Sequence, residues 1–71
     1  MKTQGTVKWF NEKRGYGFIL DAEGVEYFFH YRDIVMPGFQ TLMDGQSVLF
    51  SPEETSNGPI AKSIIPVGNN L

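Results

Sequence analysis

The run Lys13-Arg14-Gly15-Tyr16-Gly17-Phe18-Ile19 is typical of a short β-strand with two different faces. Successive side chains of a strand point to opposite sides, so Tyr16 and Phe18 share one face while Gly17 lies on the other. A glycine on the inner side leaves that side thin, which suits a strongly curved barrel wall. The next β-rich run, Tyr27-Phe28-Phe29-His30-Tyr31, is aromatic at four of its positions.

Aromatic side chains are concentrated in one part of the chain, since residues 9–31 hold eight of the ten. A domain of 71 residues has too small a core to bury so many rings on two adjacent strands easily. Rings left on a surface beside lysine and arginine can stack on unpaired bases while the cations contact phosphates. The pattern therefore indicates binding of single-stranded nucleic acid.

Glycine and proline interrupt the chain too often for long helices, and short β-rich runs between turns fit better. We expect strands at 6–12, 15–21, 26–31, 46–51 and 59–67, one helical turn at 32–35 and a flexible tail at 68–71. These elements predict an all-β fold, a closed five-stranded barrel, because closure removes exposed sheet edges. Alternation places five residues in its interior: Val7, Ile19, Val48, Phe50 and Ile64.

Composition excludes several kinds of site. The chain has no cysteine and one histidine, so we expect no disulfide, no thiol nucleophile and no metal site.

No apolar run reaches the ~20 residues of a membrane span, and residues 1–5 begin no signal peptide, so we expect a cytoplasmic location. His30 has no triad partner and there is no phosphate-binding loop, so we expect neither enzyme activity nor a cofactor.

Six motifs occur in order along the chain. They are Gly5-x-Val7-Lys8-Trp9-Phe10-Asn11, Arg14-Gly15-Tyr16-Gly17-Phe18-Ile19, Phe28-x-His30-Tyr31, Gly38-Phe39-x-Thr41-Leu42, Gly45-Gln46-x-Val48-x-Phe50 and Gly58-Pro59-x-Ala61. Together they strongly resemble the bacterial cold-shock protein family. The resemblance implies one cold-shock domain at 1–71 with its core at 5–67, folded as a five-stranded antiparallel OB-fold barrel.

The same resemblance implies binding of single-stranded RNA and DNA with low sequence selectivity, and melting of RNA secondary structure. It nominates nine residues for the binding surface: Lys8, Trp9, Arg14, Tyr16, Phe18, Phe28, His30, Tyr31 and Phe39. The alternation of side chains independently supports Tyr16, Phe18, Phe28 and His30.

Trp9 is the position where the two arguments disagree. Strict alternation places Trp9 inside the barrel with Val7, whereas the resemblance places it on the binding surface. A bulge near Lys8 would turn the Trp9 side chain outward. We therefore expect such a bulge, and we do not include Phe10 in the surface.

The chain departs from the usual family pattern at four positions. Tyr27 and Phe29 stand where valine is usual, and two larger rings pointing inward would overpack a barrel unless space appears elsewhere. Gln40 replaces a usual lysine, and Asn57 stands where a basic residue is common. These two changes predict that affinity depends more on stacking than on phosphate contacts.

The sequence favours a non-catalytic RNA chaperone that acts as a monomer or homodimer, and strand exchange is one route to the dimer. Gln46-Ser47-Val48 and Ile64-Ile65-Pro66-Val67 are similar to a branch of the family linked to single-stranded DNA and inhibition of replication. A protein-interaction module is a further alternative, because exposed aromatic side chains often mark protein interfaces.

Overall fold

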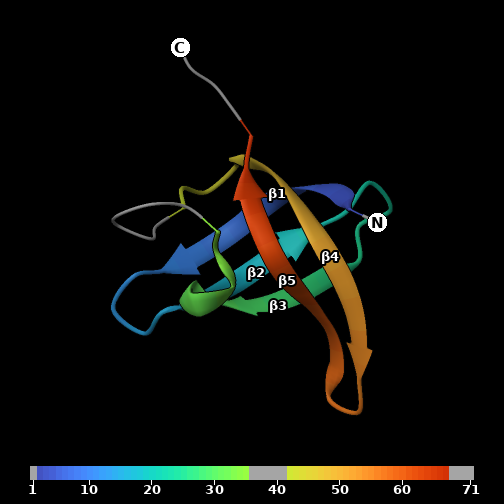
Figure 1. The fold of residues 1–71 in the computed structure, drawn as a ribbon. Coiled ribbons are helices and arrows are strands. Elements are labelled where there is room, and N and C mark those ends of the chain that lie inside the picture. Colours follow the sequence, from blue (N-terminus) through green and yellow to red (C-terminus); the bar gives the residue numbers. More distant parts are fainter. Residues whose placement is uncertain (1, 36–41, 68–71) are drawn as a thin grey trace.

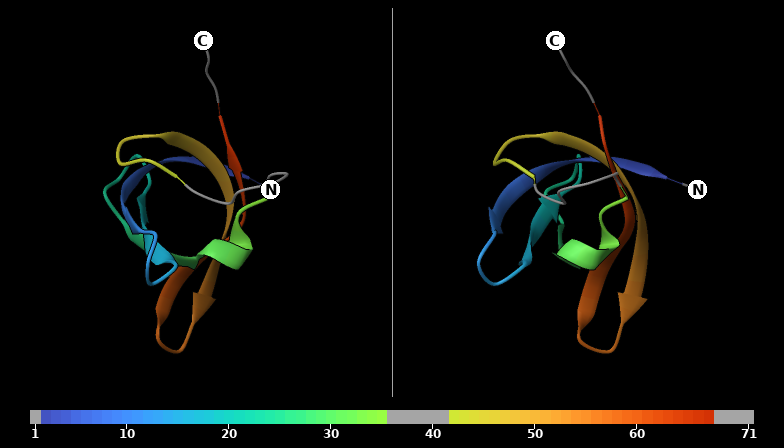
Figure 2. Two further views of the ribbon diagram at one scale, coloured as in Figure 1. Left: turned by 90° about the vertical axis from the view of Figure 1, so that its left-hand side faces the viewer. Right: turned by 60° about the vertical axis from the view of Figure 1, so that its left-hand side comes forward.

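The structure is a computed structural model that describes residues 2–35 and 42–67. Within these residues it is all-β, and its strands close into a barrel in the order β1-β2-β3-β5-β4 (Figures 1 and 2). The elements are β1 (Thr3–Asn11), β2 (Tyr16–Leu20), β3 (Glu26–His30), the 3-10 helix η1 (Tyr31–Asp33), β4 (Ser47–Thr55) and β5 (Gly58–Pro66). The predicted five-stranded barrel is confirmed, whereas Phe39, Gln40 and the expected flexible tail at 68–71 lie outside the described residues.

The regular alternation of inward and outward side chains along β1 is interrupted at one point. Its pairing with β2 shifts register between Val7 and Trp9, so that Val7 lies opposite Ile19 while Trp9 lies opposite Phe18. Lys8 is the extra residue, and the expected bulge is confirmed. The bulge turns Trp9 outward, and Phe10 instead packs against the core.

The junction between β3 and β5 is parallel, with Phe28 opposite Ile60. The other neighbouring strands of the described barrel pair antiparallel. Strand directions cannot alternate all the way round a closed ring of five, because an odd number leaves two neighbours running the same way. The barrel is therefore antiparallel except where this geometry requires one parallel junction.

β4 is longer than the sequence predicts, since it continues through Pro52 to Thr55 rather than ending at Ser51. Pairing between β1 and β4 ends where Thr3 lies opposite Phe50. Beyond that point β5 is the one described strand that pairs with β4. A proline is tolerated on such an edge, because its missing N–H is not needed by a second neighbour.

The core contains all five residues that alternation placed inside the barrel. Its buried members are Val7, Ile19, Phe29, Ile34, Leu42, Val48, Phe50, Ala61 and Ile64. They come from every strand and from the segments that follow η1, so the barrel interior is one continuous apolar cluster.

Tyr27 and Phe29 both point inward, and glycines lie beside the fully buried rings of the core. Phe29 is fully buried, and the ring of Tyr27 lies 4.9 Å from that of Phe50. A Cβ atom on Gly17 would lie 3.1 Å from Cε1 of Phe29, and one on Gly5 would lie 2.8 Å from Cε1 of Phe50. Gly17 therefore leaves space for the ring of Phe29, and Gly5 leaves space for the ring of Phe50.

Candidate nucleic-acid interface

Four aromatic rings form a connected surface on the outer side of β1, β2 and β3. The ring centroid of Trp9 lies 5.8 Å from that of Tyr16 and 5.4 Å from that of Phe18. The ring of Phe28 lies 5.7 Å from Tyr16 and 5.6 Å from Phe18. Each ring thus contacts two others, and we call this group of four the aromatic platform.

The pairing of β2 with β3 directs the platform outward. Phe18 lies opposite Phe28, and Tyr16 lies opposite His30, while the intervening Phe29 faces the interior. Phe28 is 39% exposed, and the other platform residues are half-buried. These side chains are therefore accessible to a ligand rather than enclosed in the core.

His30 and Tyr31 extend the aromatic surface at the end of β3. Their ring centroids lie 4.5 Å apart. Tyr31 lies over the backbone of Gly15, where any side chain would collide with the tyrosine ring. Nδ1 of His30 accepts from the backbone N–H and from Nε–H of Arg32, at 3.3 Å and 3.4 Å. Asp33 accepts the backbone N–H of His30 at 3.1 Å, which fixes the start of η1.

The two cations nominated by the sequence have different surroundings. Lys8 forms an ion pair with Glu26, with 2.5 Å between Nζ and Oε2, and both side chains are nearly half exposed. Arg14 is exposed in the turn between β1 and β2, and its backbone N–H donates to Oδ1 of Asn11. Lys8 is therefore partly neutralised by its neighbour on β3.

Two residues of this surface were missed by sequence reasoning. Glu26 lies two positions before Phe28, so alternation could have placed it on the same face of β3. Arg32 gives no such signal, because its contact with His30 depends on the turn of η1. Phe39, the ninth nominated residue, lies outside the described part of the chain.

A recess of about 480 Å³ adjoins the platform. Phe18, Phe28 and Glu26 line one side, and the β4–β5 hairpin provides the other with Thr55, Asn57, Gly58, Pro59 and Ile60. Apolar rings thus lie next to the carboxylate of Glu26 and the amide of Asn57. Such a combination suits a flat, partly polar group such as a nucleobase.

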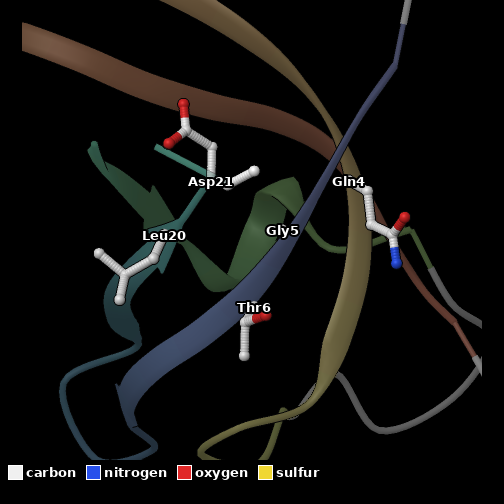
Figure 3. Close-up of a pocket in the computed structure, with 6 residues that line it drawn as sticks. Gln4, Gly5, Thr6, Leu20 and Asp21 are labelled. Carbon is white, nitrogen blue, oxygen red and sulfur yellow. The ribbon is translucent and has the colours of Figure 1, made fainter. Parts of the chain in front are cut away.

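A second pocket, of about 210 Å³, lies where β1 separates from the end of β2 (Figure 3). The labelled side chains of Gln4, Thr6, Leu20 and Asp21 point in different directions rather than toward one another. The Asp21 carboxylate is already engaged by its own turn and by Tyr27. The pocket therefore has no convergent set of polar groups.

Two other kinds of feature do not occur in residues 2–35 and 42–67. No three histidine, cysteine or acidic side chains gather there into a group that could hold a metal ion. None of the helices there is long and apolar enough to cross a bilayer.

The sequence model of the "Cold-shock" DNA-binding domain matches residues 3–67. The chain belongs to the cold-shock domain family. Cold shock protein 1 of Lactiplantibacillus plantarum is 47% identical over 62 residues, which cover 87% of this chain and 94% of the relative. The major cold shock protein of Streptococcus pyogenes serotype M1 is 49% identical over 61 residues, which cover 86% of this chain and 91% of the relative. Cold shock-like protein CspA of Vibrio cholerae is 47% identical over 64 residues, 89% of this chain and 91% of the relative.

This cold-shock domain is also similar to a solved structure, drosophila Unr CSD456. The TM-score is 0.78 at 22% sequence identity, over 99% of this chain and 28% of that chain. The likeness confirms the fold of the barrel. As a cold-shock domain, the chain belongs to a class of nucleic-acid-binding proteins.

Proposed function

We propose that this cold-shock domain binds single-stranded RNA and DNA by stacking bases on the aromatic platform. The observation that carries the proposal is the closed group of four outward rings, in a small domain that buries Phe29 and Phe50 completely. Stacking tolerates any base because every base has a π-face, so low sequence selectivity follows. The proposed contact surface is Lys8, Trp9, Arg14, Tyr16, Phe18, Phe28, His30, Tyr31 and Phe39.

The proposed biological activity is that of an RNA chaperone. A base in a duplex is stacked and paired, so its face cannot reach the platform. Each base stacked on an aromatic side chain contributes about 1–3 kcal/mol to binding. Binding to the single strand alone shifts the equilibrium toward the melted form by mass action, without nucleotide hydrolysis.

The test is to truncate one platform ring and compare it with an equally exposed apolar side chain elsewhere. Phe28→Ala removes a stacking face, and loss of one stacked base should weaken binding of a short oligothymidylate about 5- to 150-fold. Ile65→Ala is the control, because Phe28 and Ile65 are both 39% exposed and Ile65 lies on β5 opposite Leu49 of β4. Fluorescence titration measures the affinity, and a thermal melt checks that both variants fold.

Equal affinity of the Phe28→Ala and Ile65→Ala variants would contradict stacking on the platform. Failure of poly-dT and poly-U to change the fluorescence of Trp9 would instead favour the protein-interaction module. Inhibition of replication stays a prediction from the two short motifs, and preference for DNA over RNA in the same titrations would support it.

A further inference from the structure

The two ends of the outer face of β3 differ in charge. Glu26, Phe28 and His30 point to the same side of this strand, and its ends lie about 13 Å apart at ~3.3 Å per residue. Phe28 lies in the middle, in contact with the other platform rings. A single strand crossing the platform therefore meets the carboxylate of Glu26 at one end and the guanidinium of Arg32 beside His30 at the other.

At the Glu26 end, the nearby cation is already paired. Nζ of Lys8 lies 2.5 Å from Oε2 of Glu26. A phosphate that approaches Lys8 has to compete with this carboxylate and is repelled by it. The Glu26 end of the platform is thus poorly suited to hold a phosphate.

At the His30 end, the cation is Arg32, which has no ion pair with any described acidic side chain. Among the described residues, the Arg32 side chain bonds to His30 alone, through Nε–H, so the terminal nitrogens Nη1 and Nη2 can bind a ligand. Its acidic neighbour Asp33 is engaged elsewhere, because one oxygen accepts the N–H of His30 and the other lies 3.5 Å from Nζ of Lys62.

The turn between β1 and β2 brings further positive charge to the same end. The backbone N–H of Tyr31 donates to the carbonyl of Gly15 at 2.8 Å, so this turn lies beside η1 (Figures 1 and 2). Lys13 and Arg14 are exposed in that turn. Glu12 is exposed in the same turn, but Lys13 and Arg14 outnumber it, so the turn adds net positive charge beside the His30–Tyr31 ring pair.

We propose that Arg32 is the phosphate anchor of the interface, and that it binds the phosphodiester next to the base stacked on His30. A guanidinium offers two parallel N–H donors to phosphate oxygens, which fixes orientation as well as adding charge. Because Nδ1 of His30 accepts from Arg32, the neutral imidazole carries its proton on Nε2 and can donate to the same ligand. This inference depends on the proposed function and assigns the phosphate contact within it.

The experiment compares Arg32→Gln, Arg32→Lys and the control Lys2→Gln with the unmodified chain. Lys2 carries the same charge as Arg32, but its ammonium donates to the carbonyl of Ser63 on β5. The affinity for an oligothymidylate of about six nucleotides is titrated over a range of salt concentrations. Arg32→Gln should weaken binding about five-fold or more at low salt and make the log–log salt slope shallower by about 0.7, the value for one phosphate contact.

Arg32→Lys should keep the slope while losing part of the affinity, because the charge remains without the paired donors. A second series replaces each phosphodiester of the oligonucleotide in turn by an uncharged methylphosphonate. One position should cost the unmodified protein more than the others, and that extra cost should disappear in Arg32→Gln.

An Arg32→Gln variant with the salt slope and methylphosphonate profile of Lys2→Gln would overturn the assignment, even though the proposed function would stand. Failure of the unmodified chain to bind the oligonucleotide would contradict the proposed function and this inference together. Circular dichroism of the variants checks that a loss of affinity does not come from unfolding.

Discussion

Glu26 controls the charge at one edge of the aromatic platform. Its carboxylate holds Lys8 on the outer face, at the edge of the recess beside Phe18 and Phe28. Both partners of the ion pair are nearly half exposed, and exposed pairs contribute only about 0–1 kcal/mol to stability. The pair therefore matters little for folding, but it determines how much of the Lys8 charge is available to a ligand.

Glu26→Gln should release Lys8 for a phosphate and remove a like charge from its path. We expect affinity for an oligothymidylate to rise a few-fold, and the salt slope to steepen by about 0.7. Glu23→Gln is the control, because it changes the net charge equally from the turn between β2 and β3. Equal effects of the two substitutions would mean that only net charge matters and that the Lys8–Glu26 pair plays no specific part.

At the scale of elements, the turn between β2 and β3 is closed by one carboxylate. Oδ1 of Asp21 accepts the backbone N–H groups of Glu23 and Val25, at 2.9 Å and 3.0 Å. Oδ2 accepts the hydroxyl of Tyr27 at 3.0 Å. The N–H of Val25 is the main group that holds the pKa of Asp21 below its ordinary value of 3.8. Burial, and then the bond to Asp21, raise the pKa of Tyr27 above 10.0.

These shifts predict how stability depends on pH. A lowered carboxyl pKa stabilises the fold above the ordinary value of 3.8, and the contribution is lost as pH falls through the folded-state pKa. A raised tyrosine pKa stabilises the fold below 10.0, and that contribution is lost as pH rises through its folded-state pKa. Asp21→Asn should therefore lower the free energy of unfolding at neutral pH, with a smaller difference from the unmodified chain in acid.

Urea denaturation at a series of pH values measures both effects. Tyr27→Phe is the matched variant, because it keeps the turn bonds of Asp21 and removes the ionisable hydroxyl. In Tyr27→Phe, the free energy of unfolding should no longer fall at alkaline pH because of this hydroxyl. Most of its decrease in acid should remain. The free energies of unfolding of Asp21→Asn and the unmodified chain should converge in acid. If their difference stays constant down to strong acid, the charge of Asp21 does not support the turn.

At the scale of the whole molecule, the proposed binding of a polyanion has to overcome an unfavourable net charge of −2. Attraction between the whole chain and a polyanion is therefore weak, and affinity has to come from local stacking and a small number of local cations. With about two to four phosphate contacts, the log–log salt slope should lie at roughly −1.4 to −2.8.

The proposed chaperone activity can be tested on a hairpin labelled with a fluorophore and a quencher. Titration with the protein should raise the fluorescence, because binding to the open strand pulls the equilibrium away from the closed form. The Phe28→Ala variant at the same concentration should open less of the hairpin, since it offers fewer stacking faces. Saturated binding to the unpaired loop without any rise in fluorescence would show that the domain binds single strands without melting the stem.

Local patterns in the sequence determined most of the fold. Side-chain alternation in residues 15–21 and 26–31 correctly assigned Tyr16, Phe18 and Phe28 to the outside, because alternation depends only on the strand itself. The same reasoning assigned the five core positions. The bulge that turns Trp9 outward was expected only because alternation and the family resemblance disagreed there.

Tertiary structure decided the features that join distant parts of the chain. The Lys8–Glu26 pair connects residues 18 positions apart, and the space for Phe29 comes from Gly17 on the neighbouring strand. The single parallel junction follows from closing an odd number of strands. Charge pairing and packing depend on which strands become neighbours, and no local pattern carries that information.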